Sequence, residues 1–360
     1  MLMDAFDKFR NDPKHLVNWN FLIVILILFF SLINRLIHWD SLNEVGQIFP
    51  YFLLLIPTYV IAICFRRSDA KVLVSLVAIE GVMVIVQWLF GVSTFDSSME
   101  GYATFEEGAL AYFQRPFGWS TGSSIMATKL FLAYLTLDFF QFKGKLFLVF
   151  RLVFITAIVF TFNRTVILSL GVFLLLSQIV AFIKMRYTLE NAWIGLFTAI
   201  LGGGAVFAIV VMKGQQIIAQ LTRNTGSVEL TGREYLWMDF YAFISQHLVF
   251  GNSSIKLWLD GYHAHNSYLE LIATNGVFIS IVYMVFIFRN MKATNWIYII
   301  PILIFGLTQY AFFWGISLFD IMLVVFLVKE VSGQAIVTFS PSLPTPEQTQ
   351  QEDLRKRMPS

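Results

Sequence analysis

The sequence predicts an all-α, polytopic integral membrane protein with about ten transmembrane helices. Hydrophobic residues make up 57% of the 360 residues and charged residues only 13%, about half the charged share of a soluble domain. The apolar residues also gather in runs of about 20, the length that crosses a hydrocarbon core. This composition excludes a cytosolic enzyme, a disordered protein and a disulfide-stapled secreted domain. The net charge of +2 is too small to indicate a nucleic-acid partner, and the single Cys64 cannot form an internal disulfide.

The apolar runs are separated by polar gaps, and each run is a candidate transmembrane helix. The first run is too long for a signal peptide and has no small-residue cleavage site after it, so we expect it to remain as a signal anchor. The expected spans are residues 17–37, 47–65, 72–92, 122–140, 145–162, 166–183, 191–212, 268–288, 295–311 and 313–328.

Lys and Arg residues occur in every second gap, which predicts the topology. Short cytoplasmic loops carry an excess of basic residues, so both termini are expected in the cytoplasm, with residues 1–16 as the cytoplasmic N-terminus and 17–328 as the membrane domain. Residues 93–121 and 213–267 are then external loops, and the larger one is expected to hold short amphipathic helices. The tail 329–360, rich in Pro, Gln and Glu, cannot bury a core and is expected to be disordered.

The first polar motif is Asn163-Arg164-Thr165, in the short external gap between the fifth and sixth spans. Arg is under-represented on that side. An ionised side chain at the membrane surface is costly, and such residues usually pair with another group or mark a substrate path. The alternative is an Arg that extends its charged group into water from a helix end.

The second motif is Thr231-Gly232-Arg233-Glu234, followed by an aromatic run to about Leu248. The spacing of Thr231 and Glu234 is that of a capping box, so a helix is predicted to begin here and to lie along the membrane surface. A helix N-terminus with an Arg in its first turn suits a phosphate anion. The alternative is an ordinary capped loop helix with an exposed Arg.

The third motif is the string HAHNSYLE, residues 263–270, at the start of the eighth span. Ser267 and Glu270 again have capping-box spacing, which predicts a helix start just after His265. A neutral imidazole accepts a proton from a hydroxyl near pH 7, so His265 is a candidate general base. The alternatives are a metal site at His263 and His265 and an inert loop histidine.

Polar residues inside the spans are less informative. Lys129 lies about two turns inside the outer end of the fourth span and is a candidate anion ligand. The chain has no Walker motif, dinucleotide fingerprint, nucleophile elbow or HExxH pattern. A mechanism driven by ATP or NAD is therefore not expected.

Taken in order, these motifs resemble the polytopic O-antigen ligase/polymerase superfamily, which contains the Wzy-type polymerases of O-antigen and capsule and the O-antigen ligases. The resemblance runs from about residue 115 to 328. Its most specific part is the pair of helix starts on either side of one large external loop. The matching strings are RPFG (115–118), NRT (163–165), TGREYLW (231–237), FGN (250–252) and HNSYLELIATNG (265–276).

The resemblance implies a GT-C-type membrane glycosyltransferase that needs no nucleotide sugar, metal or other cofactor. Its donor would be a glycan on undecaprenyl diphosphate at the outer face of the cytoplasmic membrane. By position, Arg164 and Arg233 would bind the leaving diphosphate, whose growing charge fixed guanidinium groups stabilise. His265 would be the base on the acceptor hydroxyl, and direct attack would invert the anomeric centre. Candidate substrate-binding residues nearby are Arg115, Lys129, His263, Asn266 and Tyr268.

Three functions remain open at this stage. The favoured one is a polymerase that joins lipid-linked repeat units into O-antigen or capsular polysaccharide, working with a flippase and a chain-length regulator. The second is an O-antigen ligase, which uses the same donor and transfers the glycan to lipid A-core. The third is a transporter or flippase of lipid-linked sugars, which would carry its charges nearer the bilayer midplane and often show internal repeats.

Overall fold

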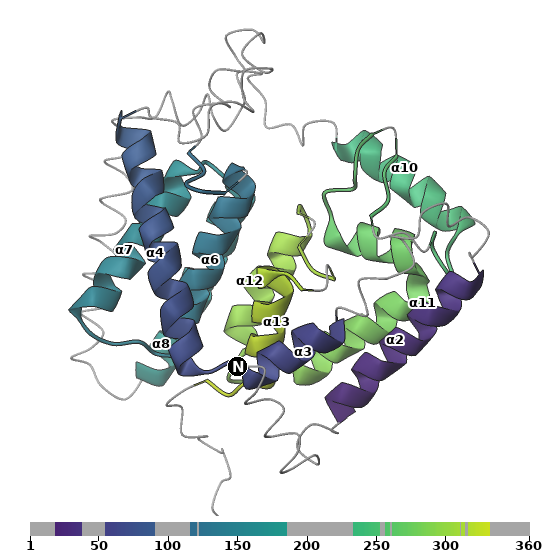
Figure 1. Ribbon diagram of the computed structural model, residues 1–360, viewed down its shortest axis with the longest axis horizontal. Coiled ribbons are helices and arrows are strands. Elements are labelled where there is room, and N and C mark those ends of the chain that lie inside the picture. Colours follow the sequence, from purple (N-terminus) through teal and green to yellow (C-terminus); the bar gives the residue numbers. More distant parts are fainter. Residues whose placement is uncertain are drawn as a thin grey trace, which may run out of the picture.

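The computed structural model describes residues 19–37, 55–90, 116–120, 122–185, 233–252, 256–259, 261–309, 311–313 and 316–331. The regular elements of these residues are all helices (Figure 1). The helices are α2 (Trp19–Ile37), α3 (Leu55–Cys64), α4 (Arg67–Phe90), α6 (Ser123–Phe139), α7 (Lys145–Phe160), α8 (Arg164–Met185), α10 (Arg233–Gln246), α11 (Ser267–Asn290), α12 (Trp296–Gly306) and α13 (Leu318–Val328).

The expected span 191–212 lies outside the described residues. Each of the other expected spans contains a helix. Three helices, α2, α4 and α11, are long and apolar enough to cross a membrane, and α3, α8, α12 and α13 are shorter apolar helices. The long helices indicate a multi-pass, all-α membrane protein. Of the expected external loops 93–121 and 213–267 the structure describes parts only, and of the tail 329–360 only the first residues.

The outward faces of the long helices are apolar. Along α2, Leu22, Phe29 and Leu36 are between 47% and 61% exposed, whereas Val24 and Ile27 are buried. The stripe recurs every three or four residues, as one face of a helix does. A soluble monomer rarely exposes so large an apolar patch. These faces are suited to contact with lipid, and α4 has the same pattern, with Leu76 and Ile79 exposed.

The helices form two groups joined by a central pair. In Figure 1, α4, α6, α7 and α8 lie together on one side and α2, α10 and α11 on the other, with α12 and α13 between them. Helix α12 packs on α8, and α13 packs on α3 and α6. The first group is tightly packed, because a Cβ on Gly81 of α4 would lie 2.9 Å from Val153 of α7. Small residues allow such close approach between membrane helices.

One end of the molecule, here called the lower end, gathers most of the predicted cytoplasmic gaps. Arg67 donates to the Gln141 carbonyl (3.2 Å), and Lys329 donates to the carbonyl of Ile63. Asn295 donates to the carbonyl of Phe326 (2.9 Å). The side chains of Asn20 and Asn290 bond to each other at the foot of α2 and α11. The basic residues at this end are Arg66, Arg67, Lys143, Arg289, Lys292 and Lys329.

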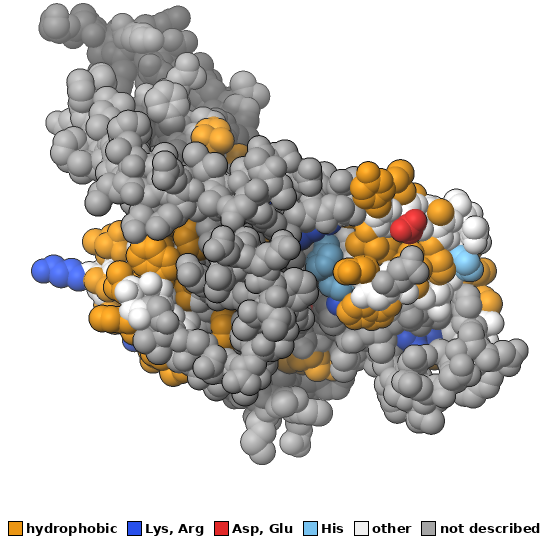
Figure 2. Space-filling view, turned by 90° about the horizontal axis from the view of Figure 1, so that it is seen from above, with side chains coloured by type: hydrophobic (Ala, Val, Ile, Leu, Met, Phe, Trp, Pro, Cys, Tyr) orange, Lys and Arg blue, Asp and Glu red, His pale blue; other side chains and the backbone are white. Residues whose placement is uncertain are grey.

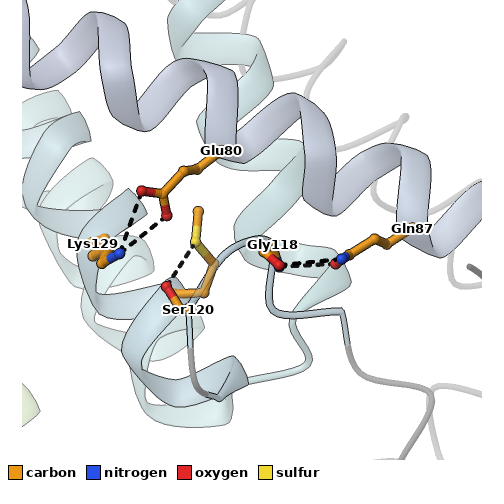
Figure 3. A network of polar contacts seen from close by, with 6 residues as sticks. Glu80, Gln87, Gly118, Ser120 and Lys129 are labelled. Atoms are coloured by element: carbon orange, nitrogen blue, oxygen red, sulfur yellow. Dashed lines mark hydrogen bonds and ion pairs between the residues drawn. The ribbon is translucent and has the colours of Figure 1, made fainter. Parts of the chain in front are cut away.

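The opposite, upper end of the same helices gathers the predicted external motifs. Figure 3 shows Gln87, near the end of α4, bonded to the turn at Gly118. Gln87 accepts from the backbone N–H groups of Phe117 (3.2 Å) and Gly118 (2.8 Å) and donates to the Gly118 carbonyl. Two of the four residues of the RPFG motif are thereby held against α4, while Arg115 lies outside the described residues.

Candidate functional site

The upper end is organised around the non-helical segment between α12 and α13, residues 307–309 and 311–313, here called the junction segment. Helix α12 ends at Gly306, which leaves backbone carbonyls without helical partners. Arg233 donates through Nη1 to the Thr308 carbonyl (2.9 Å), and Ser267 donates to the Gln309 carbonyl (2.7 Å). The hydroxyls of Thr165 and Thr308 lie 2.7 Å apart. The starts of α8, α10 and α11 therefore meet on one short piece of chain.

Local packing explains why the junction segment turns here. A Cβ on Gly306 would lie 2.5 Å from the ring of Phe312, so only glycine lets that ring pack against the helix end. Phe313 has a φ of 71° and donates its N–H to Asp320, 2.7 Å away. The buried Asp320 thereby fixes the strained turn from its place in the first turn of α13.

Arg164 is the first residue of α8, and the residues around it fix its place. The side chain of Asn163 accepts from the N–H of Val166 (3.1 Å), which is an N-cap bond, and donates to Ser124 at the start of α6 (3.0 Å). The next residue, Thr165, meets Thr308. The half-buried Arg164 therefore directly precedes Thr165, which contacts Thr308. The carbonyl of the same Thr308 accepts from Arg233.

Helix α10 is described from Arg233 onward; Thr231 and Gly232 lie outside the described residues, so the predicted capping box and helix start stay a prediction. Phe240 and Ile244 of α10 are buried in a small second core with parts of residues 256–264 and α11. Trp237 donates its indole N–H to the Ala264 carbonyl (2.7 Å). The TGREYLW string (231–237) and the HAHNSYLE string (263–270) are thus in direct contact.

The start of α11 differs from the predicted capping box. The N-cap is Asn266, whose side chain accepts from the N–H groups of Tyr268 (2.9 Å) and Leu269 (3.1 Å). Ser267 faces the junction segment instead, and the Glu270 carboxylate accepts from loop backbone. Ser267 and Glu270, which the local spacing assigned to the helix cap, thus bond to residues distant from the start of α11 instead. Asn266, predicted as a substrate ligand, has this capping role in the structure.

Glu270 holds the histidine loop in place. It is fully buried, and its two oxygens accept from the N–H groups of Leu257 (3.1 Å) and Ala264 (3.2 Å). A buried backbone N–H needs a partner, and one carboxylate provides it at both ends of the loop 256–264. The loop that carries His263 is therefore anchored to α11 itself.

The rings of the two histidines are in contact in this loop, tilted by 45° to each other. Their ring centroids are 3.7 Å apart, and Nδ1 of His263 accepts from the backbone N–H of His265 (3.1 Å). That bond places the proton of a neutral His263 on Nε2. His265 has a φ of 47°, a left-handed conformation that is uncommon outside glycine and occurs at functional sites.

A positive field surrounds these imidazoles. Burial, followed by the charges of Arg233 and Lys256, lowers the pKa of His265 to about 4. Burial, the neighbouring His265, Lys256 and Arg233 lower the pKa of His263 to about 3. Both rings are therefore neutral at pH 7. The same charges attract anions, and at the surface Figure 2 shows histidine and basic side chains adjoining near the middle of the view.

Lys256 is a site residue that sequence reasoning missed. Its ammonium lies 4.5 Å from the centre of the Trp258 ring, and it acts on both histidines. Burial lowers the pKa of Lys256, while the negative charge of Glu270 acts against that shift. A single lysine in a loop carries no local signal. Only the fold reveals that it adds a third positive group near Arg233.

Two other predicted ligands have structural partners. The Tyr268 hydroxyl donates to the carbonyl of Leu303 near the end of α12 (2.9 Å), and its ring packs edge-on against Phe312. Lys129 forms an ion pair with Glu80 across α4 and α6 (3.2 Å, Figure 3). The structure thus brings Tyr268 to the junction segment and Lys129 to a neighbouring helix.

No group of three or more metal-binding side chains occurs within the described part of the chain. The paired His263 and His265 are therefore not joined there by a carboxylate or thiolate in a coordinating arrangement. The arrangement that does occur combines neutral imidazoles with guanidinium and ammonium groups, which is suited to proton transfer beside a bound anion.

Comparisons with protein-family models, with curated proteins and with solved structures find no match to this chain.

Proposed function

We propose that this chain is an integral-membrane glycosyltransferase that polymerises oligosaccharide repeat units carried on undecaprenyl diphosphate, as in O-antigen or capsule synthesis. The observation that carries the proposal is the half-buried, neutral His265 in the positive field of Arg233 and Lys256. A half-buried imidazole beside fixed cations suits attack by a hydroxyl with departure of an anion, because a bound diphosphate would offset the cations that lower the pKa of His265.

In the proposed reaction an imidazole nitrogen of His265 takes the proton of the acceptor hydroxyl. The hydroxyl oxygen bonds to the anomeric carbon, and the bond from that carbon to the diphosphate oxygen breaks with inversion. The electron pair leaves with the diphosphate, and Arg164, Arg233 and Lys256 stabilise its charge. The cations do the work that a divalent metal does in other transferases. No metal or nucleotide sugar takes part.

The proposed topology has about ten spans, both termini in the cytoplasm and the upper end outside. Support comes from the distribution of basic residues: Arg67, Lys143, Arg289 and Lys329 lie at the lower end. Cytoplasmic loops are enriched in such residues. The upper end would then face the leaflet in which a lipid-linked donor is used.

A polymerase and a ligase differ in acceptor, so the acceptor distinguishes them. The purified chain in lipid nanodiscs is expected to extend one lipid-linked oligosaccharide with another. Transfer to lipid A-core without chain growth would identify a ligase. A transporter would move the donor between leaflets and form no new glycosidic bond. Its charges would also be expected near the midplane, whereas Arg233 and Lys256 gather at one end of the helices.

Replacing Arg233 tests the proposal. Arg233→Ala is expected to lower the polymerisation rate roughly 100- to 1,000-fold, because a fixed donor to the leaving group is lost. The rate is measured as elongation of labelled donor on gels. Arg289→Ala is the matched control, because Arg289 is an exposed arginine at the lower end. Wild-type polymer from Arg233→Ala would refute the diphosphate role.

Because Arg233 also bonds to Thr308, a second variant separates structure from chemistry. Arg233→Lys retains a charge and a hydrogen-bond donor but not the planar fork that grips a phosphate at two points. It is expected to keep the melting temperature of the wild type and to lose most activity. A lysine variant with full activity would show that the fork is not used.

A further inference from the structure

The lower end contains a cavity of about 630 Å³ among α6, α7, α8 and α12. This volume lies within the range of small-molecule sites. Its wall combines basic, amide, hydroxyl and apolar side chains and is lined by Asp138, Gln141, Phe142, Lys143, Gly144, Leu148, Arg151, Ser177, Gln178, Val180, Ile297 and Tyr298. None of these residues belongs to the site at the upper end.

The charges of this cavity favour an anion. Asp138 is its one carboxylate, and it already accepts from Arg151 (3.3 Å) and from the Tyr298 hydroxyl (2.9 Å). Lys143 is an exposed second cation on the wall. Arg67, which is not part of the wall, lies over the ring of the lining residue Phe142 at 5.2 Å. Two cations, Lys143 and Arg151, therefore accompany one carboxylate in the wall.

Neutral groups of the wall complete a binding surface for a phosphate ester. The Ser177 hydroxyl oxygen is buried and has no hydrogen-bond partner within the described part of the chain. Gln178, one residue further along α8, is exposed, so its amide can meet a ligand from the same side. Leu148 and Val180 provide an apolar wall. Donors beside an apolar wall are what a lipid headgroup and the first carbons of its chains require.

We propose that this cavity binds the phosphodiester headgroup of an anionic phospholipid, in the leaflet opposite the glycosyltransferase site. The phosphate would lie between Lys143 and Arg151, with its glycerol oxygens toward Ser177 and Gln178. The acyl chains would follow Leu148 away from the opening. Basic pockets between membrane helices on the cytoplasmic side bind such headgroups. The proposal concerns a different end of the molecule and does not depend on the transferase chemistry.

Lipid titration of the detergent-purified chain tests it. Phosphatidylglycerol is expected to remain bound in native mass spectra and to raise the melting temperature, whereas phosphatidylcholine does neither. Lys143→Gln is expected to weaken phosphatidylglycerol binding about fivefold, the effect of one basic group near an anionic headgroup. Lys292→Gln, which changes an exposed lysine at the same end but outside the cavity, is the matched control.

Three outcomes would overturn the assignment. The first is equal weakening by Lys143→Gln and Lys292→Gln, which would indicate a diffuse surface charge. The second is equal retention of phosphatidylcholine. The third is full protection by inorganic phosphate or glycerol 3-phosphate alone, which would identify a free anion as the ligand. Because Lys143 is exposed, the lipid-free variant is expected to melt as the wild type does, so a loss of binding reports on the site.

Discussion

Two arginines, one at each end of the helix bundle, have different kinds of partner. At the lower end, Arg151 meets the carboxylate of Asp138, which also accepts from a tyrosine. At the upper end, Arg233 meets a backbone carbonyl of the junction segment. The carboxylate offsets part of the charge of Arg151, whereas the carbonyl of Thr308 satisfies a donor of Arg233 and brings no countercharge. The effect of Arg233 on His265 is consistent with this difference.

The comparison also shows what a break between membrane helices requires. Backbone carbonyls without helical partners are costly in an apolar medium, so irregular segments occur there only where other groups bond to them. In this chain Arg233 and Ser267 donate to carbonyls of the junction segment, and Tyr268 donates to the carbonyl of Leu303 in the last turn of α12. The same side chains that stabilise the break thereby assemble the candidate site.

The sharpest test of the difference between the two ends is His265→Ala. If the upper end is catalytic, the rate of glycan transfer should fall about 100- to 10,000-fold, the usual contribution of a positioned base. Donor binding, measured by titration of lipid-linked substrate, should change little. His247→Ala is the control, because His247 is exposed beyond the end of α10. Equal rates for the two variants would remove His265 as the base.

A second test is Gly276→Ala, which affects the bend that separates the upper part of α11 from the rest. Gly276 has a φ of 79°, and a Cβ there would lie 1.9 Å from the carbonyl oxygen of Val249. Insertion of a methyl group into such packing is expected to cost about 3 kcal/mol, measured by denaturant unfolding in detergent. Gly171→Ala, where a Cβ meets nothing within 4 Å, should be near neutral. Equal stability of both variants would mean that the bend can relax.

A third test compares the loss of stability when one carboxylate at each end, Glu270 or Asp138, is replaced by an amide. Each oxygen of Glu270 accepts from one buried backbone N–H group. Glu270→Gln replaces one of these oxygens with an NH2 group that cannot accept, so it should cost about 1 to 3 kcal/mol of stability. Asp138→Asn weakens an ion pair that is about one-third exposed, so its cost should be below about 1 kcal/mol. Both are measured by chemical unfolding. A larger loss for Asp138→Asn would reverse the proposed ranking.

A further expected effect at the upper end is a pH dependence of stability, which is small near pH 7 and grows toward pH 4. The pKa of His265 is lowered to about 4 in the folded chain and is near 6.5 when unfolded. The unfolded chain therefore binds more protons between these values, so stability should fall as the pH drops from 6.5 toward 4. The double variant His263→Gln/His265→Gln should lose part of this slope in melting curves. An unchanged slope would contradict the burial of the two rings.

Much of the helical framework could be predicted from hydropathy alone. The expected span 145–162 corresponds to α7 at Lys145–Phe160, and 268–288 corresponds to α11 at Ser267–Asn290. Apolar runs of this length determine the segment because lipid leaves no other way to satisfy the backbone. The bend at Gly276 was not predicted, although an Asn-Gly pair within an apolar run is a turn signal.

The candidate site was predictable only in part. Arg164, Arg233 and His265 each lie at or just before a helix start, and local spacing placed them there. The contacts of Thr165 and Arg233 with Thr308 have no signal in the sequence, because they depend on where α12 ends in space. The cap of α11 was predicted wrongly for the same reason: a carbonyl from a distant segment accepts from Ser267.

The order of synthesis adds a consequence of the junction segment. Chains emerge from the ribosome N-terminus first, so Arg164, Arg233 and His265 leave it well before Thr308 and Gln309, on which the starts of their helices converge. A chain that stops short of residue 307 keeps the residues of the contact between α10 and the histidine loop but lacks the segment on which the starts of α8, α10 and α11 converge. If the proposed function is correct, activity is therefore expected only after the last pair of helices has been inserted.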